Sequence, residues 1–213
     1  MTKEYVILVD KDDSEIGLEE KIKCHLPNGK LHRAFTALLF DNTGKLVLTK
    51  RSPNKMLWPG DWDGTVASHP RKNESYTASA ERRMPEEMGI SCKFDYLFKF
   101  EYHVPYKDVG SENEICGTLI SIIPASCKFN LVEDEITEIK WITPNELIVQ
   151  LEKNPEIYCP WMLIALFFLA KSNEEIFSKY RSILVQWVNP KIKKALEESI
   201  KFHLRDNIWR LVK

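Results

Sequence analysis

Short apolar segments separated by turn residues fill the first two thirds of the chain, and this pattern predicts a region built mainly from strands. The segment 34–40 is almost entirely apolar, which is typical of a buried strand. Asp41-Asn42-Thr43-Gly44 predicts a turn, after which 45–50 is expected to return antiparallel. Further strands are expected at 5–9, 63–66, 94–102, 112–123 and 136–142, with loops at 51–62 and 109–111.

One helix is predicted in the middle of this strand-rich region, over residues 75–88. Ser75 or Asn73 can cap its start, and Gly89 ends it. Pro85 lies inside this segment, where it removes a backbone donor and clashes with the preceding turn. We therefore expect a kink or an early end of the regular helix at Pro85.

Helical patterns dominate the last third of the chain. Pro144 is a favoured first residue of a helix, and 161–170 is apolar enough to form a buried one. From Asn173 onward the tail is predicted to be helical, because apolar residues recur every four positions: Ile192, Leu196, Ile200, Leu204 and Ile208.

Strands followed by helices predict an α+β domain of packed layers. We expect residues 1–170 to form this domain. Residues 171–213 are expected to form a C-terminal helical extension whose apolar stripe docks on the domain or on a second subunit, the latter giving a homodimer.

Composition and charge limit the cellular location and the kinds of partner that we expect. The 213 residues are 44% hydrophobic and 29% charged, as in ordinary soluble proteins, and a net charge of -1 gives no global attraction to nucleic acid or anionic membranes. Five irregularly spaced cysteines form no disulfide framework, which predicts a reducing, cytoplasmic location. The longest apolar run, 161–170, is too short to insert across a bilayer.

A metal site is the first candidate for chemistry. Glu112 and Glu114 are two positions apart on a predicted strand, so both point to one face and repel each other unless a cation or a shared proton lies between them. His25, His32 and His69 are each more often structural when taken alone. Together the five side chains make a nitrogen and oxygen ligand set that suits Mn²⁺ or Mg²⁺, with Zn²⁺ as the alternative.

A phosphate-binding group is the second candidate. Arg83 and Glu87 are one turn apart and share a face of the predicted helix, whereas Glu86 is rotated by ~100°. Such a run is also typical of a solvated helix face with ion pairs. Arginine and lysine bind phosphate, and four such residues come from separate segments, although each alone is more often a solvated surface residue: Lys21, Arg51, Lys55 and Arg83.

The chain from about Glu4 to Ala170 resembles the type I isopentenyl diphosphate isomerases, members of the Nudix superfamily. The matching residues are His25, Leu31-His32, Lys50-Arg51, Lys55, Trp58-Pro59-Gly60, His69-Pro70, Glu74, Arg82-Arg83, Glu87 to Gly89, Glu112-Asn113-Glu114, Trp141 and Cys159-Pro160-Trp161. The resemblance implies a Nudix fold, with mixed β-sheets sandwiched by helices. It also implies an isomerase that converts isopentenyl to dimethylallyl diphosphate by protonation and deprotonation.

Site roles follow from the same resemblance. It implies that His25, His32, His69, Glu112 and Glu114 bind one metal ion, and that Glu87 binds the Mg²⁺ of the substrate's diphosphate. It implies that Lys21, Arg51, Lys55 and Arg83 hold the diphosphate. Tyr102 and Trp161 would form an aromatic pocket that shelters a carbocation. Glu114, assisted by Tyr102, would be one of two proton-transfer groups.

The second proton-transfer group of the family is a cysteine, and its position is Ala67 here. Alanine transfers no proton, and losing one partner of an acid–base pair typically costs ~10²–10⁴-fold in rate. Cys116, two residues from Glu114 on the strand, is the one nearby replacement in sequence. Three explanations stay open: a designed substitution that traps substrate, different chemistry on a prenyl diphosphate, or binding without turnover.

Other departures from the family pattern keep alternative functions open. The Nudix box expects glycine at Ser68 and glutamate at Arg83; the isomerases share the second change, which argues against ordinary Nudix hydrolysis. Glu86-Glu87 nevertheless restores a hydrolase-like pair. The alternatives are a Nudix hydrolase of a diphosphate, a cation-driven rearrangement or cyclisation of a longer prenyl diphosphate, and a non-catalytic prenyl-diphosphate binder.

Overall fold

A computed structural model describes residues 3–172, 174–204 and 209–212. Its strands are β1 (Tyr5–Val9), β2 (Glu15–Glu20), β3 (His32–Asp41), β4 (Leu46–Arg51), β5 (Trp62–Asp63), β6 (Val66–Ser68), β7 (Asp95–Tyr106), β8 (Gly110–Ile123), β9 (Ile136–Ile142) and β10 (Trp209–Val212). Its helices are α1 (Lys21–His25), α2 (Tyr76–Met88), α3 (Pro144–Lys153), α4 (Pro160–Leu169), α5 (Glu174–Lys179), α6 (Arg181–Leu184) and α7 (Pro190–Leu204), with a 3₁₀ turn at Pro155–Ile157. Mixed strands with helices on both sides confirm the α+β class.

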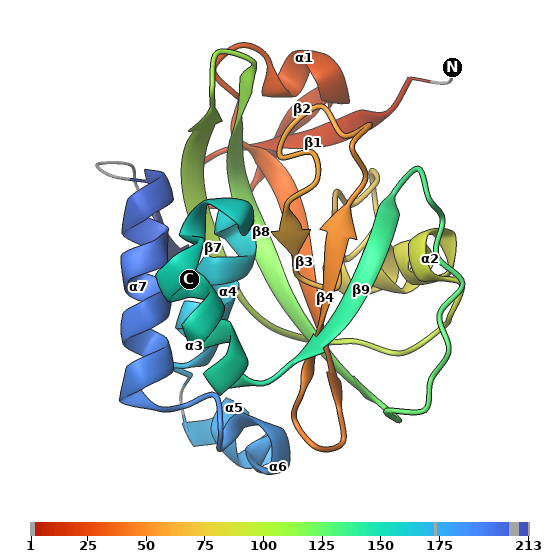
Figure 1. Cartoon of the computed structure of the whole chain (residues 1–213). Helices are drawn as coiled ribbons and strands as arrows, with labels where there is room; N and C mark the ends of the chain where they lie inside the picture. Colours follow the sequence, from red (N-terminus) through yellow and green to blue (C-terminus); the bar gives the residue numbers. More distant parts are fainter. Residues whose placement is uncertain (1–2, 173, 205–208, 213) are drawn as a thin grey trace.

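Strand β3 is the centre of the molecule and is buried on both faces. Ala34, Leu38 and Phe40 point into a core that α3, α4 and α7 cover, whereas Phe35, Ala37 and Leu39 point into a second core under α2. Figure 1 shows the strands between these two helical layers. The almost continuous apolar run of β3 is therefore the sequence signature of a strand sandwiched by helices.

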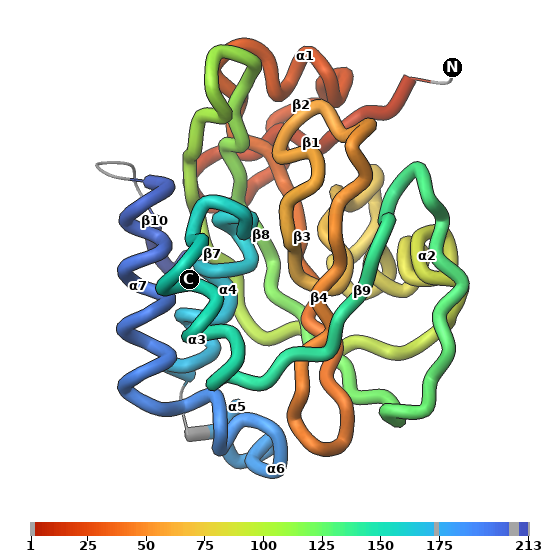
Figure 2. The backbone as a smooth tube through the Cα atoms, viewed as in Figure 1, coloured from red at the N-terminus to blue at the C-terminus, as the bar shows by residue number. Residues whose placement is uncertain are grey.

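Strands β3 and β4 form the predicted hairpin only next to the turn that joins them. Phe40 pairs with Leu46, and the two strands then separate. β3 pairs in parallel with β8, while β4 pairs with β9, which lies on the side of β4 away from β3 (Figure 2). The segment 62–68 enters the gap, where β5 pairs with β4 and β6 pairs with β3. The single strand predicted at 63–66 is thus two short strands.

Helix α2 begins and ends where the sequence predicts. The Ser75 hydroxyl accepts a hydrogen bond from the backbone N–H of Ala78, and Gly89 has the left-handed conformation with φ 67°. The expectation of an early end at Pro85 is wrong, because the helix continues to Met88. Pro85 lies on the exposed side, while Met84 and Met88 are buried and hold the last turn on the sheet.

Two further sequence predictions are corrected at strand ends. Residues 109–111 are not all loop, since β8 begins at Gly110, which pairs with Tyr106 of β7. β7 likewise extends past the predicted end at Tyr102 as far as Tyr106. A tight turn at 107–109, with Lys107 at φ 51°, joins the two strands and lengthens the sheet beside the cavity described below.

The C-terminal residues pack onto the rest of the chain. The apolar stripe of α7 is buried in the same core as α4: Ile192, Leu196, Ile200 and Leu204. Ile208 lies outside the described residues. The prediction of a wholly helical tail is wrong at its end, because Trp209–Val212 form β10 on the edge of β7. This pairing satisfies backbone groups that an edge strand would otherwise expose.

In the part of the chain that the structure describes, no helix combines the length and apolar character needed to cross a bilayer.

Candidate active site and metal centre

The sheet register brings the predicted metal ligands together. His32, at the start of β3, is opposite Glu114 of β8, and Tyr102 of β7 pairs with Glu114 from the other side. His25 is the last residue of α1, and His69 follows β6 directly. Residues separated by up to 89 positions in sequence therefore meet because three adjacent strands align them.

The cluster is compact. The ring centroids of His25, His32 and His69 are 4.7, 5.3 and 5.0 Å apart. One ligand atom from each of these histidines and from Glu112 and Glu114 lies within 4.8 Å of all the others. All five side chains are buried or nearly so, which is a costly arrangement for polar groups that lack partners.

Hydrogen bonding at the rear of two rings points their other nitrogens inward. Nδ1 of His25 lies 2.6 Å from the carbonyl oxygen of Lys21, and Nδ1 of His32 lies 2.8 Å from that of Lys30. Carbonyls only accept, so Nδ1 carries a proton, and in the neutral ring Nε2 then offers a lone pair. This tautomer is the one required of a histidine that binds a metal through Nε2.

Three atoms at the centre are buried without a hydrogen-bond partner: Nε2 of His32, Nε2 of His69 and Oε2 of Glu112. His25 Nε2 is 3.0 Å from Glu112 Oε2, and Nε2 of both His32 and His69 is 3.3–3.4 Å from Glu114 Oε1, without the alignment of hydrogen bonds. An unpartnered buried polar atom costs roughly 1–3 kcal/mol. A cation at the centre would satisfy all three atoms, so the donor set fits a bound metal ion.

Charges within the cluster shift its pKa values in opposite directions. Burial and the neighbouring His32 hold the pKa of His69 well below its ordinary value. Burial also acts to lower the pKa of His32, but contacts with Cys24 and Glu114 outweigh it and raise that pKa. For Glu114, burial is outweighed by contacts with His32 and Tyr102, so its pKa is lowered. Glu114 is therefore held as a carboxylate.

A cavity of about 320 Å³ opens beside the cluster. The candidate site residues that border it are Lys21, His25, Arg51, Lys55, Ala67, His69, Arg83, Tyr102, Glu112, Glu114 and Trp161. His32 and Glu87 are not among its lining residues. The cavity therefore brings most of the predicted metal ligands, the predicted phosphate-binding cations and the two aromatic rings together in one place.

Tyr102 and Glu114, predicted from the family resemblance to act in proton transfer, lie together in the inner wall of the cavity. The Tyr102 hydroxyl donates a 2.6 Å hydrogen bond to Oε2 of Glu114, and both residues are fully buried. Ala67 of β6, which pairs with Thr36 of β3, borders the same cavity and offers only a methyl group. Cys116 does share the face of β8 with Glu114, but it is buried in the core and does not border the cavity.

Trp161 is fixed in the inner wall by polar contacts. Its Nε1 donates to Asp63 at 2.7 Å, and the Arg51 guanidinium lies 5.2 Å from its ring centroid. Arg51 donates as well to the carbonyls of Leu57 and Trp58 and to Asp63. The guanidinium is thereby oriented by four neighbours before any ligand binds.

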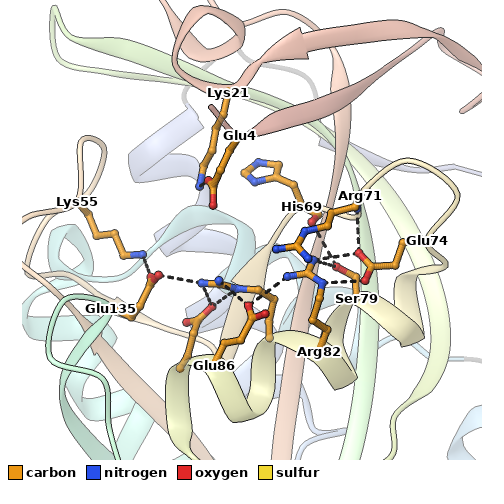
Figure 3. A network of polar contacts seen from close by, with 12 residues as sticks. Glu4, Lys21, Lys55, His69, Arg71, Glu74, Ser79, Arg82, Glu86 and Glu135 are labelled. Atoms are coloured by element: carbon orange, nitrogen blue, oxygen red, sulfur yellow. Dashed lines mark hydrogen bonds and ion pairs between the residues drawn. The ribbon is translucent and has the colours of Figure 1, made fainter. Parts of the chain in front are cut away.

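The other predicted phosphate-binding cations are paired with carboxylates. Lys21 binds Glu4 at 2.9 Å, and Lys55 binds Glu135. Arg83 contacts Glu86, Glu87 and Glu135 at 2.9, 2.7 and 3.0 Å. Figure 3 shows Glu135 beside Lys55 and Glu4 beside Lys21. Glu87 is buried against Arg83, and burial raises the pKa of this carboxyl despite the neighbouring guanidinium.

Sequence reasoning missed Glu4 and Glu135. Glu135 lies in a loop between β8 and β9, yet it bridges Lys55 and Arg83, and its carbonyl accepts from Ser52 N–H. The acidic run Glu133-Asp134-Glu135 was the only signal, and it does not indicate which carboxylate turns inward.

Comparisons with known proteins agree with this geometry. Residues 30–162 match the NUDIX domain. Among solved structures, one from Deinococcus radiodurans is similar at a TM-score of 0.55 and 23% identity, covering 70% of this chain and 89% of that one. A MutT NUDIX hydrolase from Burkholderia pseudomallei has a TM-score of 0.50 at 19% identity, covering 64% and 95%. The domain match and the shared fold thus define a Nudix-domain protein.

Curated relatives narrow the class further. An isopentenyl-diphosphate Delta-isomerase of Haloarcula marismortui is 38% identical over 174 residues, covering 77% of this chain and 90% of the relative. Those of Halobacterium salinarum and Photorhabdus laumondii are 36% and 33% identical, covering 76% and 74% of this chain and 78% and 90% of theirs. The chain belongs to the type I isopentenyl-diphosphate Delta-isomerase family, which confirms the resemblance seen in its sequence.

Proposed function

We propose that this protein acts on isopentenyl diphosphate as a Delta-isomerase, moving its double bond to give dimethylallyl diphosphate. The names of the relatives support this activity. The observation that carries the proposal is the single cavity bordered by metal ligands, the Tyr102–Glu114 pair and four cations. A polar head and a small apolar tail, joined in one ligand, match such a cavity.

The cations would hold the diphosphate at the mouth of the cavity. Lys21, Lys55 and Arg83 come from three segments, and exchange of their carboxylate partners for phosphate oxygens would keep each charge neutralised. Arg51 would add a guanidinium that is already oriented. We further propose that Glu87, beside Arg83, binds a magnesium ion carried by the diphosphate.

The inner wall would serve the reaction. Tyr102 and Trp161 present ring faces that stabilise a tertiary carbocation formed on protonation of the alkene. Glu114, hydrogen-bonded to Tyr102, would transfer a proton at its carboxyl oxygen. His25, His32, His69, Glu112 and Glu114 would hold a divalent cation, with Mn²⁺ or Mg²⁺ favoured over Zn²⁺, whose positive charge stabilises the Glu114 carboxylate.

Ala67 leaves the opposite face of the substrate without a proton-transfer group. We therefore expect native turnover to be lower by ~10²–10⁴-fold than in a protein with a thiol at this position. The test supplies isopentenyl diphosphate in heavy water with Mg²⁺ and Mn²⁺, and measures deuterium in dimethylallyl diphosphate. Ala67→Cys should raise incorporation at least ~100-fold.

Ala67→Ser is the matched control, because a hydroxyl is similar in size to a thiol and a far weaker acid. Equal incorporation in the native protein and both variants would contradict the role assigned to position 67. Phosphate release without any deuterated product would replace the isomerase proposal by a hydrolase. The cytoplasmic location, the homodimer and the division at residue 170 stay predictions.

A further inference from the structure

A second cavity of about 360 Å³ lies on the other side of the Glu4–Lys21 ion pair. The start of β1, the N-terminus of α1, residues 68–72 and the middle of α2 form its walls. Figure 3 shows the two sides: Lys55 and Glu135 lie on one side of Glu4 and Lys21, and Arg71 and Arg82 lie on the other. None of the roles proposed above requires this second space.

The lining of the second cavity is strongly cationic. Six of its residues carry a positive charge and one, Glu4, carries a negative charge: the cations are Lys3, Lys21, Arg71, Lys72, Arg82 and Arg83. The chain as a whole has a net charge of -1, so this concentration is local. Opposing cations around a recess raise the potential inside it and attract anions.

Two of these cations have no carboxylate partner. Lys3, Lys21, Arg82 and Arg83 each form ion pairs, whereas neither Arg71 nor Lys72 forms one with any described residue. Both side chains are exposed at the edge of the cavity. Their charges are therefore available to a ligand without breaking an existing contact.

The segment that carries Arg71 and Lys72 is held in place by its own contacts. Glu74 accepts from the backbone N–H of Arg71 at 2.9 Å and from Arg82 at 2.8 and 3.0 Å. Ser79 donates to the carbonyl of His69 at 3.3 Å. A fixed loop loses little conformational freedom on binding, which favours affinity.

We propose that this second cavity binds the phosphate chain of an oligophosphate. Arginine and lysine from three sides match the several charged oxygens of such a chain better than a single carboxylate would. Five residues border both cavities: Glu4, Lys21, Ser68, His69 and Arg83. An oligophosphate here therefore draws on two cations of the diphosphate site, Lys21 and Arg83, and weakens binding there. The ligand is either a free inorganic oligophosphate or the head group of a second prenyl diphosphate.

The test titrates the whole metal-free protein with inorganic triphosphate by calorimetry at low salt. We expect two binding events. Arg71→Gln/Lys72→Gln should weaken one of them at least ~10-fold, because the change removes two positive charges available to phosphate oxygens. Lys55→Gln should weaken the other event. Lys128→Gln/Lys153→Gln removes two exposed positive charges away from the cavity and is the matched control.

A single binding event that Arg71→Gln/Lys72→Gln leaves unchanged would overturn the proposal, as would equal weakening in both double variants. A parallel titration with isopentenyl diphosphate distinguishes the sources. If the native protein binds a second equivalent of isopentenyl diphosphate and Arg71→Gln/Lys72→Gln does not, the ligand of the second cavity is a prenyl diphosphate. If the native protein binds only one equivalent, the ligand is the inorganic oligophosphate. Binding is read without turnover, so this result and the deuterium assay can fail independently.

Discussion

The two polar walls of the first cavity are organised in opposite ways. On the proposed metal-binding wall, atoms of His69 and Glu112 are buried without hydrogen-bond partners, as is Nε2 of His32, which belongs to the same cluster but does not border the cavity. On the wall proposed to bind the diphosphate, here called the phosphate-binding wall, Lys21, Lys55 and Arg83 are each paired with a carboxylate. The first wall is incomplete without a cation, whereas the second is electrostatically complete before any ligand arrives.

This difference indicates two kinds of binding. A metal ion satisfies groups that have no alternative, so removing one ligand should have a large effect. A diphosphate would have to displace Glu4 and Glu135 from the cations. Its binding free energy is therefore the difference between the new contacts with phosphate and the ion pairs that are lost. Single changes on the phosphate-binding wall should therefore have smaller effects, and one of them should strengthen binding.

The largest effect is expected for Glu112→Gln. This change replaces an anionic ligand with a neutral amide that binds cations weakly, and Glu112 has no proposed role in proton transfer. We expect the affinity for Mn²⁺ to fall at least ~100-fold, since even outer contacts of metal ligands contribute 10–100-fold. Calorimetric titration and the rise in melting temperature on adding Mn²⁺ measure this loss.

Glu152→Gln is the matched control for this change, because Glu152 is exposed on α3 and forms no ion pair with a described residue. Unchanged Mn²⁺ affinity in Glu112→Gln would mean that the five side chains do not act as one site. The incomplete wall would then be a buried hydrogen-bond cluster instead.

Interactions between residues close together in the sequence could be predicted, whereas interactions between distant residues could not. The caps of α2 at Ser75 and Gly89 were predicted because a cap involves neighbouring residues. The metal ligands were proposed from their donor types and from the family resemblance. No local pattern predicted that β3 and β8 run parallel, and this pairing is what brings His32 beside Glu114.

The errors have the same physical origin. The strand β10 forms because β7 offers an edge for pairing, which the sequence of the tail does not reveal. Pro85 is tolerated because tertiary contacts of Met84 and Met88 hold the helix. Glu135 was missed because its role depends on a loop that returns to Lys55, 80 residues earlier.

The second largest effect is expected for Arg51→Lys. Arg51 donates to two backbone carbonyls and to Asp63 while it lies over Trp161. A lysine ammonium has no planar fork and cannot keep these contacts together. We expect binding of isopentenyl diphosphate to weaken about tenfold, measured by calorimetry. Lys50→Arg, at the neighbouring partly buried position that does not border the cavity, is the control. Binding within twofold of the native protein would show that only the charge of Arg51 matters.

A smaller effect of opposite sign is expected for Glu135→Gln. The change removes a carboxylate that competes with phosphate for Lys55 and Arg83. Partly exposed ion pairs contribute roughly 0.5–1 kcal/mol, so diphosphate should bind about threefold more tightly. Competition with inorganic diphosphate measures this gain, and Glu133→Gln, an exposed neighbour, is the control. Weaker binding would mean that Glu135 positions the two cations for the ligand, and the contrast between the walls would be lost.

The smallest effect concerns pH and Asp61, whose backbone carbonyl accepts from Arg51 N–H beside the phosphate-binding wall. Burial raises the pKa of Asp61 to about 6, although Arg51 and Lys107 oppose the change. The folded state therefore binds this proton more tightly than the unfolded chain, whose aspartate pKa is about 3.9. The free energy of unfolding must fall as pH rises between these two values, and the loss is complete above about pH 6.

Asp61→Asn removes this titration. Because the side chain is only partly buried, we expect the variant to be more stable than the native protein by only about 1 kcal/mol at pH 7.5, and equally stable near pH 3.5. Urea unfolding at both pH values measures the difference, with the exposed Asp108→Asn as the control. A less stable variant at pH 7.5 would mean that attraction to Arg51 and Lys107 outweighs burial, and that Asp61 belongs to the paired, electrostatically complete wall.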